Sequence, residues 1–430
     1  MTQAETPHVG FDALLAEAEA LDGADRLRAW RESFVIADPE LIYLDGNSLG
    51  RLPTATPARL ARLVERDWGE ALVRGWPGGW IDAPRRVGDR LGAVLGAGPG
   101  QVVACDSVSV NLYKLAMAAL AARPERTVVV TDGLNFPSDG YVLAGCVATL
   151  GGGRSLRTVA SRDGVGIDRD ALAAAIDADT ALVCLGHVAY KSGFRFDAAE
   201  ITRLAQARGA WVLWDVSHSA GAVPVALDAW GADLAVGCTY KYLNGGPGAP
   251  GFLYVAERHQ TRLVSPIQGW FGQHRPFDFS ERYQPAVGID RFLAGTPPIV
   301  SLEAAAVGIE QVAEAGVEAL AAKAACQTAW LIELAERWLA PLGVAVATPR
   351  EPRERGAHVS LRHAEAYRIN RALIDEARVL PDFREPDVIR FGLSPLYTRY
   401  ADIAQAVIRT HTVIARRRYE HYDHERAAVT

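Results

Sequence analysis

The sequence predicts an α/β protein with a large domain built on a mostly parallel sheet and a smaller α+β domain at its C-terminal end. Between residues 100 and 256, short apolar runs alternate with helix patterns, which is typical of a parallel sheet covered by helices. After Thr296-Pro297-Pro298 the composition shifts to Ala/Glu-rich helices and short strands. At 430 residues the chain is also longer than one core usually supports, so two domains are expected.

The elements at the start of the chain predict an N-terminal arm. Residues 11–34 read as two short amphipathic helices, and an extended segment follows at residues 41–44. Strands of the large domain are then predicted at residues 127–130, 181–185, 211–214, 234–239 and 252–255. The C-terminal domain is expected to hold helices over 301–339 and strands at 344–348, 357–362 and 387–393. The predicted parts are therefore an arm (1–45), a large domain (46–300) and a small domain (301–430).

One crossover unit indicates where a ligand would bind. Asp197 and Glu200 form a capping-box pattern, Gly209 ends the helix, and a strand lies on each side. In open α/β sheets, ligands bind beyond the carboxyl ends of the strands. Asp215 and Lys241 close two of the predicted strands, so these residues are the first candidates for a site.

Composition favours a folded protein that acts on small molecules. Apolar residues make up 49% of the chain and the formal net charge is only −6, so nothing favours nucleic acid or an anionic membrane as partner. The five cysteines form no CxxC pair, and no apolar stretch approaches the length of about 20 residues that a membrane span needs. The N-terminal sequence shows no signal-peptide pattern. We expect reduced thiols, a cytoplasmic location and no metal site.

Lys241 and Asp215 together fit a pyridoxal 5'-phosphate site. Such a site needs a lysine to hold the cofactor as a Schiff base, an acid near the pyridine nitrogen, an aromatic plate and donors for the phosphate. Lys241 precedes a glycine-rich turn at the end of a strand, and a solvated loop lysine is the alternative. Asp215 follows an apolar strand, where a buried carboxylate needs a cation, and a pyridinium would supply one. His218 could support Asp215 or the cofactor, or be an ordinary core histidine.

The phosphate donors and the aromatic plate have candidates before the two strand ends. Ser107-Val108-Ser109 precedes a helix predicted over residues 111–122, where free N–H groups could receive a dianion, although plain N-capping explains the serines equally well. Phe136-Pro137-Ser138-Asp139 follows another strand and offers a ring for stacking, although it could be a plain loop. These segments therefore complete the set of candidate cofactor contacts.

Arg390 is the candidate for binding a substrate carboxylate. It lies in the apolar pattern of residues 387–392, where a guanidinium needs an anionic partner. The carboxylate of an amino acid would satisfy it bidentately, and an internal salt bridge is the alternative.

With these motifs in place, the sequence resembles the kynureninase family, pyridoxal-phosphate enzymes of fold-type I in the class V aminotransferase superfamily. The resemblance spans almost the whole chain. Its motifs are Leu44 to Gly50, Phe136 to Asp139, Asp215 to Gly221, Tyr240 to Asn244, Gly269 to Gly272, Gly295 to Ile299 and Arg390 to Tyr397.

The resemblance implies a role for each matching position. Catalytic residues are implied at Lys241, Tyr240 and Asp215. Cofactor contacts are implied at Val108, Ser109, Phe136, Pro137, Ser138, Asp139, Gly186, Asp215, His218, Tyr240, Lys241, Trp270 and Thr296. Substrate contacts are implied at Arg390, Asn47 and Ser48. The family often has Ser or Thr where this chain has Gly186, so one side-chain donor is missing there.

The implied reaction is the hydrolysis of L-kynurenine, or its 3-hydroxy form, to an anthranilate and L-alanine. It belongs to tryptophan catabolism and can serve NAD biosynthesis. The implied assembly is a homodimer in which Trp270 and Thr296 approach the cofactor across the interface. Rival hypotheses are a cysteine desulfurase, an aminotransferase, a dinucleotide-binding oxidoreductase and an inactive binding module. A desulfurase typically has histidine where this chain has Tyr240, and no G-x-G-x-x-G follows a first strand.

Overall fold

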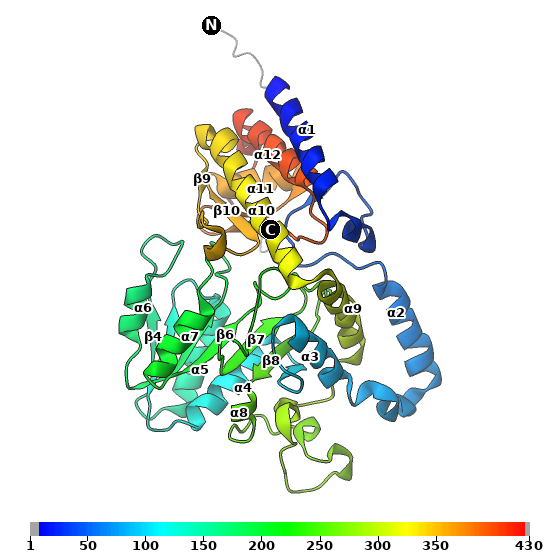
Figure 1. The fold of residues 1–430 in the computed structure, drawn as a ribbon, viewed down its shortest axis with the longest axis vertical. Coiled ribbons are helices and arrows are strands. Elements are labelled where there is room, and N and C mark those ends of the chain that lie inside the picture. The colour runs from blue at the N-terminus through cyan, green and yellow to red at the C-terminus, as the bar shows by residue number, and fades with distance from the viewer. Residues whose placement is uncertain (1–7, 426–430) are drawn as a thin grey trace.

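The computed structural model of the protein describes residues 8–425, so the first seven residues of the predicted arm and the last five of the predicted small domain lie outside it. Figure 1 shows a lower body built around a central sheet and an upper body in which helices cover a smaller sheet. Within residues 8–425, no helix is both long and apolar enough to cross a membrane.

The lower body contains a seven-stranded sheet. In spatial order its strands are β2 (Val102–Ala104), β8 (Gly251–Val255), β7 (Leu234–Cys238), β6 (Trp211–Asp215), β5 (Thr180–Gly186), β3 (Val128–Asp132) and β4 (Ser155–Val159). Strand β8 runs antiparallel to β2 and β7, and the other neighbours pair in parallel. The prediction of a mostly parallel sheet is confirmed.

Both faces of this sheet are buried, which explains why its strands read as continuous apolar runs. In β6, Val212 and Trp214 belong to the core on one face, whereas Leu213 belongs to the core on the other face. Helices of the lower body supply the other side chains of these cores. They are α3 (Ala83–Val94), α4 (Val108–Ala121), α5 (Pro137–Leu150), α6 (Arg169–Ala175), α7 (Ala198–Ala207) and α9 (Ile299–Ala315). A short helix, α8 (Glu257–Gln260), follows β8.

The upper body holds a four-stranded antiparallel sheet in the order β12 (Asp382–Arg384), β13 (Val388–Gly392), β10 (His358–Arg362) and β9 (Ala345–Val346). Its helices are α10 (Val317–Leu334), α11 (Ala366–Asp375) and α12 (Tyr400–Ala415). Helix α1 (His8–Ala24) lies beside α12 in Figure 1, and β1 (Ile42–Tyr43) pairs with β11 (Val379–Leu380). The N-terminal segment therefore packs against the C-terminal part of the chain. A short helix, α2 (Thr56–Arg62), continues toward the lower body and packs on α9.

Local sequence signals were correct in part. The Asp197 side chain accepts from Glu200 N at 2.9 Å, as predicted, but the Glu200 side chain binds Arg169 and does not return to the cap. Gly209 follows α7 with a φ of +77°, a conformation that favours glycine. Helix α4 begins at Val108, three residues before its predicted start, because Ser107 caps it by accepting from Val110 N.

Candidate active site

A cavity of about 160 Å³ lies at the carboxyl ends of the central strands. Elements β6 and β7 and the starts of α4 and α5 all contribute to its wall. The lining residues are Ser107, Val108, Ser109, Phe136, Ser138, Asp139, Asp215, Ser217, His218, Cys238, Tyr240, Lys241, Ala249 and Gly251. The fold therefore gathers most of the residues predicted to bind the cofactor in one place, where ligands of α/β sheets usually bind.

Lys241 and His218 form the most direct polar contact in this cavity. Lys241 Nζ lies 2.9 Å from His218 Nε2. Burial lowers the pKa of His218 well below its usual value, and the nearby Lys241 charge adds to this effect. A neutral imidazole can accept a hydrogen bond from the amine through Nε2, so His218 orients the Lys241 side chain. Lys241 is therefore half-buried and paired inside the cavity, and its role as the cofactor lysine stays a prediction.

Two carboxyl groups, those of Asp139 and Asp215, also line the cavity. Asp215 accepts a hydrogen bond from Ser217 N at 2.7 Å, and Asp139 is 1% exposed. Burial raises the pKa of Asp139 well above its usual value, and the charge of Asp215 and a hydrogen bond to it raise this pKa further. The raised pKa favours the neutral form of Asp139. Asp215 is the adjacent carboxyl group and the candidate partner of a cationic ring nitrogen.

The beginnings of α4 and α5 offer donors for a phosphate. Val108 and Ser109 occupy the first turn of α4, whose N–H groups have no partners within the helix. The hydroxyls of Ser109 and Ser138 lie 3.0 Å apart, so the first turns of the two helices meet. Gly251 lies against this turn, and a Cβ there would be 3.1 Å from Val108 N. A glycine at this position leaves room for an anion beside the helix.

Two aromatic rings flank the amine of Lys241. Nζ lies 5.9 Å from the ring centroid of Phe136 and 5.9 Å from that of Tyr240. The Phe136 ring is 47% exposed, so one of its faces is free to stack on a ligand. The Cys238 side chain and burial both raise the pKa of Tyr240, so its hydroxyl remains protonated at neutral pH.

The residues predicted to bind substrate lie at the junction of the two bodies. Arg390 is 1% exposed and donates from Nε to Asp382 Oδ1 at 2.7 Å, while its Nη2 binds Asp382 Oδ2. Nη2 also donates to Ser48 Oγ at 3.1 Å. With its amide oxygen facing the guanidinium, Asn47 accepts from the same nitrogen at 3.1 Å. The internal salt bridge, which was the alternative for Arg390, is therefore present. Its role toward substrate stays a prediction.

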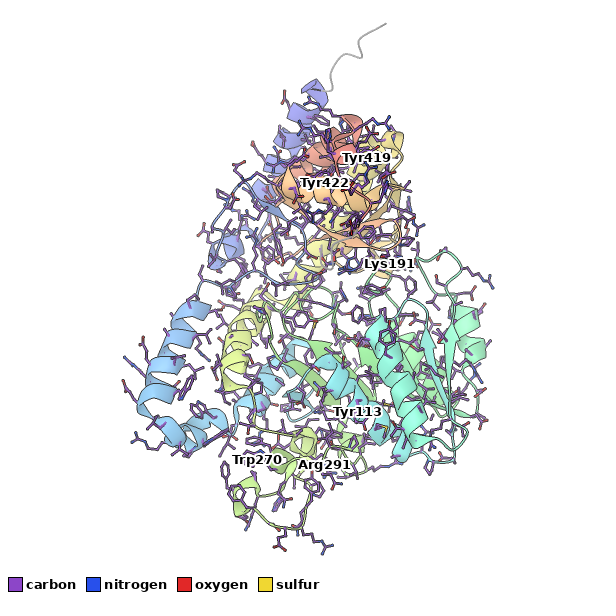
Figure 2. All side chains as sticks on the ribbon, turned by 180° about the vertical axis from the view of Figure 1, so that it is seen from behind. Tyr113, Lys191, Trp270, Arg291, Tyr419 and Tyr422 are labelled. Carbon is purple, nitrogen blue, oxygen red and sulfur yellow. The ribbon has the colours of Figure 1, made fainter. Side chains whose placement is uncertain are left out.

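Four other predicted contacts lie outside the lining as residues 8–425 define it. Gly186 ends β5 beside Asp215, and Asn135 Oδ1 lies 3.1 Å from where its Cβ would be, so Asn135 partly fills that space. Pro137 begins α5 without lining the cavity. Trp270 stacks on Phe279 near the lower end of the molecule (Figure 2). Thr296 lies in a neighbouring groove that reaches Tyr240.

Sequence reasoning missed the smaller lining residues and the partners of Arg390. The additional lining residues are Ser217, Cys238, Ala249 and Gly251. Ser217 lies inside the motif that holds Asp215 and could have been found from it. Asp382 gave no signal, because a single acid in a short strand resembles any surface carboxylate until its burial is known.

Comparisons with known proteins give a consistent result. A family model described as the kynureninase C-terminal domain matches residues 320–409. The kynureninase of Pseudomonas fluorescens is 44% identical over 393 residues, which cover 90% of this chain and 92% of that protein. The similarity therefore extends over both bodies.

Solved structures share the fold at low identity. A cysteine desulfurase from Thermococcus onnurineus NA1 aligns with a TM-score of 0.76 at 18% identity, covering 90% of this chain and 97% of that one. A C-DES variant with glycine covalently linked to its pyridoxal-phosphate cofactor aligns with a TM-score of 0.77 at 17% identity, covering 89% and 98%. At these identities the likeness shows the fold alone, and that fold is fold-type I of the pyridoxal-phosphate enzymes.

Proposed function

Because the chain belongs to the kynureninase family, we propose that the Lys241 cavity is where it hydrolyses L-kynurenine, or its 3-hydroxy form, to an anthranilate and L-alanine. The chain is thus a pyridoxal-phosphate-dependent hydrolase that acts on a carbon–carbon bond. One observation supports this choice of cavity: His218 holds the amine of Lys241 in a cavity that also contains Asp215 and the N-terminus of α4. The desulfurase alternative is not favoured, since desulfurases match at only 18% identity.

The side chains of the cavity fit pyridoxal 5'-phosphate. Three buried polar atoms of the lining lack partners among the described residues: Asp139 Oδ2, Ser217 Oγ and His218 Nδ1. A ligand that presents polar atoms would satisfy them, and an apolar ligand would not. Lys241 would hold the aldehyde, Asp215 the ring nitrogen and the first turn of α4 the phosphate. When bound, the cofactor supplies an electron sink for the negative charge that develops on the substrate carbons.

The chain's own groups are suited to the proton transfers of this reaction. Lys241 Nζ is the base for the Cα proton of the substrate. His218 accepts a hydrogen bond from this amine, which fixes the direction of the Lys241 side chain. Tyr240 lines the same cavity with a protonated hydroxyl, so it is the candidate that returns a proton to Cβ. The raised pKa of Asp139 favours its neutral form, and Asp215 beside it is the carboxyl group proposed to face the ring nitrogen.

The test is product formation by the purified protein. With added pyridoxal phosphate we expect anthranilate and alanine in equal amounts from L-kynurenine, and no activity from Lys241→Ala. Kinetics with both kynurenines would give the ring preference. Release of sulfide from cysteine without cleavage of kynurenine would overturn the proposal in favour of a desulfurase.

A homodimer with shared active sites is part of the proposal. An apolar groove of about 510 Å³ runs over the 63–80 segment and the start of α9, and its wall includes Leu72 and Val73, which are 59% and 73% exposed. Such an exposed apolar surface favours burial by a partner. Thr296 lines this groove and also the neighbouring groove that contains Tyr240, so a second copy of the chain on this face would border the cofactor site. Sedimentation of Val73→Asp, which we expect to be monomeric, tests the interface.

The remaining parts of the proposal concern location, pathway, partners and domain division. We propose a cytoplasmic location, a role in tryptophan catabolism that also supplies NAD biosynthesis, and partners limited to small molecules and a second copy of the chain. We also keep the division into 1–45, 46–300 and 301–430 as a proposal. Helix α9 lies across the boundary proposed between residues 300 and 301. It begins at Ile299 and packs against α3 of the large domain.

A further inference from the structure

The buried cluster around Arg390 contains more charge than a simple ion pair. Asp382 binds Arg390 along one edge of the guanidinium, and Arg384 Nη2 also lies 2.6 Å from Asp382 Oδ2. Two guanidinium groups therefore share one carboxylate. The nearby Asp45 offsets the excess positive charge only in part near neutral pH, because burial and the charge of Asp382 raise its pKa to about 7. The cluster therefore favours a further anionic group.

The geometry fixes which side of Arg390 remains for a ligand. Asp382 takes the Nε and Nη2 edge, and Ser48 Oγ lies 3.1 Å from both Arg390 Nη2 and Asp382 Oδ2. Asp382 and Arg390 are also direct neighbours across β12 and β13, so the sheet itself holds the pair in register. The guanidinium plane is thus fixed from one side.

The other side of Arg390 is connected to the cofactor cavity through Tyr190. Nη1 donates to the carbonyl of Tyr190, and the ring of Tyr190 packs edge-on against Phe136 with centroids 5.2 Å apart. Phe136 lines the cavity beside Lys241. The loop after β5 that carries Tyr190 is also tied to the upper body, since Lys191 Nζ donates to Glu385 O and Ser360 Oγ donates to Lys191 O. Figure 2 shows Lys191 at this junction.

We propose that Asp382 is a positioning residue for substrate recognition: it holds Arg390 by the Nε and Nη2 edge, so that the α-carboxylate of the amino-acid substrate binds on the Nη1 side. This inference rests on the proposed function, in which Arg390 receives that carboxylate. Asp382 touches neither the substrate nor the cofactor cavity and acts through the orientation of Arg390. Its loss should therefore weaken the binding of substrates that have an α-carboxylate and should affect the chemical step much less.

The test compares Asp382→Asn with two other variants of the cofactor-loaded enzyme. Asp233→Asn is the matched control, because Asp233 is a 2% exposed carboxylate that binds Arg258 and His259 far from the junction. Arg390→Met tests the underlying assignment. For each variant, KM and kcat are measured with L-kynurenine, and the inhibition constant is measured with kynuramine, which has the same aryl ketone but no α-carboxylate.

For Asp382→Asn we expect KM to rise at least tenfold, kcat to stay within about threefold and the kynuramine constant to stay within about twofold. Asp233→Asn should change none of these by more than about twofold. An Asp382→Asn enzyme with unchanged KM, or with KM and the kynuramine constant raised equally, would overturn the inference. If Arg390→Met leaves KM unchanged, the carboxylate assignment fails as well.

A second variant keeps the test decisive if Asp382→Asn does not fold. Ser48→Ala removes the hydroxyl between Asp382 and Arg390 without leaving a buried charge unpaired. We expect a smaller rise of KM, about threefold to fivefold, and again no change with kynuramine. An equal loss of affinity for both ligands would indicate a structural role and contradict the proposal.

Discussion

Replacing Gly308 by alanine should destabilise the protein, although the same change stabilises most helix interiors. Gly308 lies in the middle of α9, where alanine would be favoured over glycine by about 1 kcal/mol from helix propensity alone. A Cβ at this position, however, would clash with the carbonyl oxygen of Leu243 and lie 3.0 Å from the carbonyl carbon of Asn244. Backbone atoms of a buried loop cannot rotate away as a flexible side chain can.

The expected size of the effect follows from these two opposing contributions. Overpacking against a well-packed core costs about 1–3 kcal/mol or more, and a clash with backbone belongs at the upper end of that range. After subtracting the propensity gain, we expect the free energy of unfolding to fall by about 2 kcal/mol. The displaced loop directly follows Lys241, and Asn244 N donates to Lys241 O at 2.9 Å. Attachment of the cofactor should therefore weaken along with stability.

Gly145→Ala is the matched control for this prediction. Gly145 lies in the interior of α5 and is exposed, and an added Cβ would meet no atom within 4 Å. The control should gain up to about 1 kcal/mol. Urea unfolding of both variants without cofactor measures the difference, and absorbance after cofactor addition measures attachment. A Gly308→Ala protein that is as stable as Gly145→Ala would refute the proposed contact between α9 and the Lys241 loop.

Three further predictions concern charged groups. Asp215→Asn should retain the cofactor but lose turnover by roughly a hundredfold or more, since an amide cannot supply the charge. Cofactor content and the rate of anthranilate formation measure these two effects. Near-normal turnover would contradict the role of Asp215. The folded-state pKa of Asp45 is raised to about 7, so its contribution to stability is present at low pH and is lost as pH rises toward that value. Asp45→Asn should therefore be the more stable protein at pH 8 but not at pH 4, by urea unfolding, and an equal difference at both pH values would exclude this titration. Arg390→Met should lower the free energy of unfolding by about 2–4 kcal/mol because it leaves Asp382 with Arg384 alone, and an unchanged unfolding curve would show that the buried pair adds no stability.

The sequence was sufficient for the fold class and for naming most of the residues that line the Lys241 cavity. Continuous apolar runs require a sheet buried on both faces, and ligands of such a sheet collect at the strand ends, so the positions of Asp215 and Lys241 made them candidates for a site. The motif around Phe136 and Asp139 and the capping serine of α4 could be predicted for the same reason: each belongs to a segment that begins or ends an element. Local rules decide such positions.

Contacts between distant segments were decided only by the tertiary structure. The antiparallel direction of β8, the hydrogen bond between His218 and Lys241 and the raised pKa of Asp139 depend on which segments become neighbours. The surroundings of Arg390 are the clearest case. Its partner Asp382 lies eight residues away in sequence, but its contacts Ser48 and Tyr190 come from remote segments of the chain. Burial gives a charge its energetic importance, and burial is a property of the packed chain rather than of the local sequence.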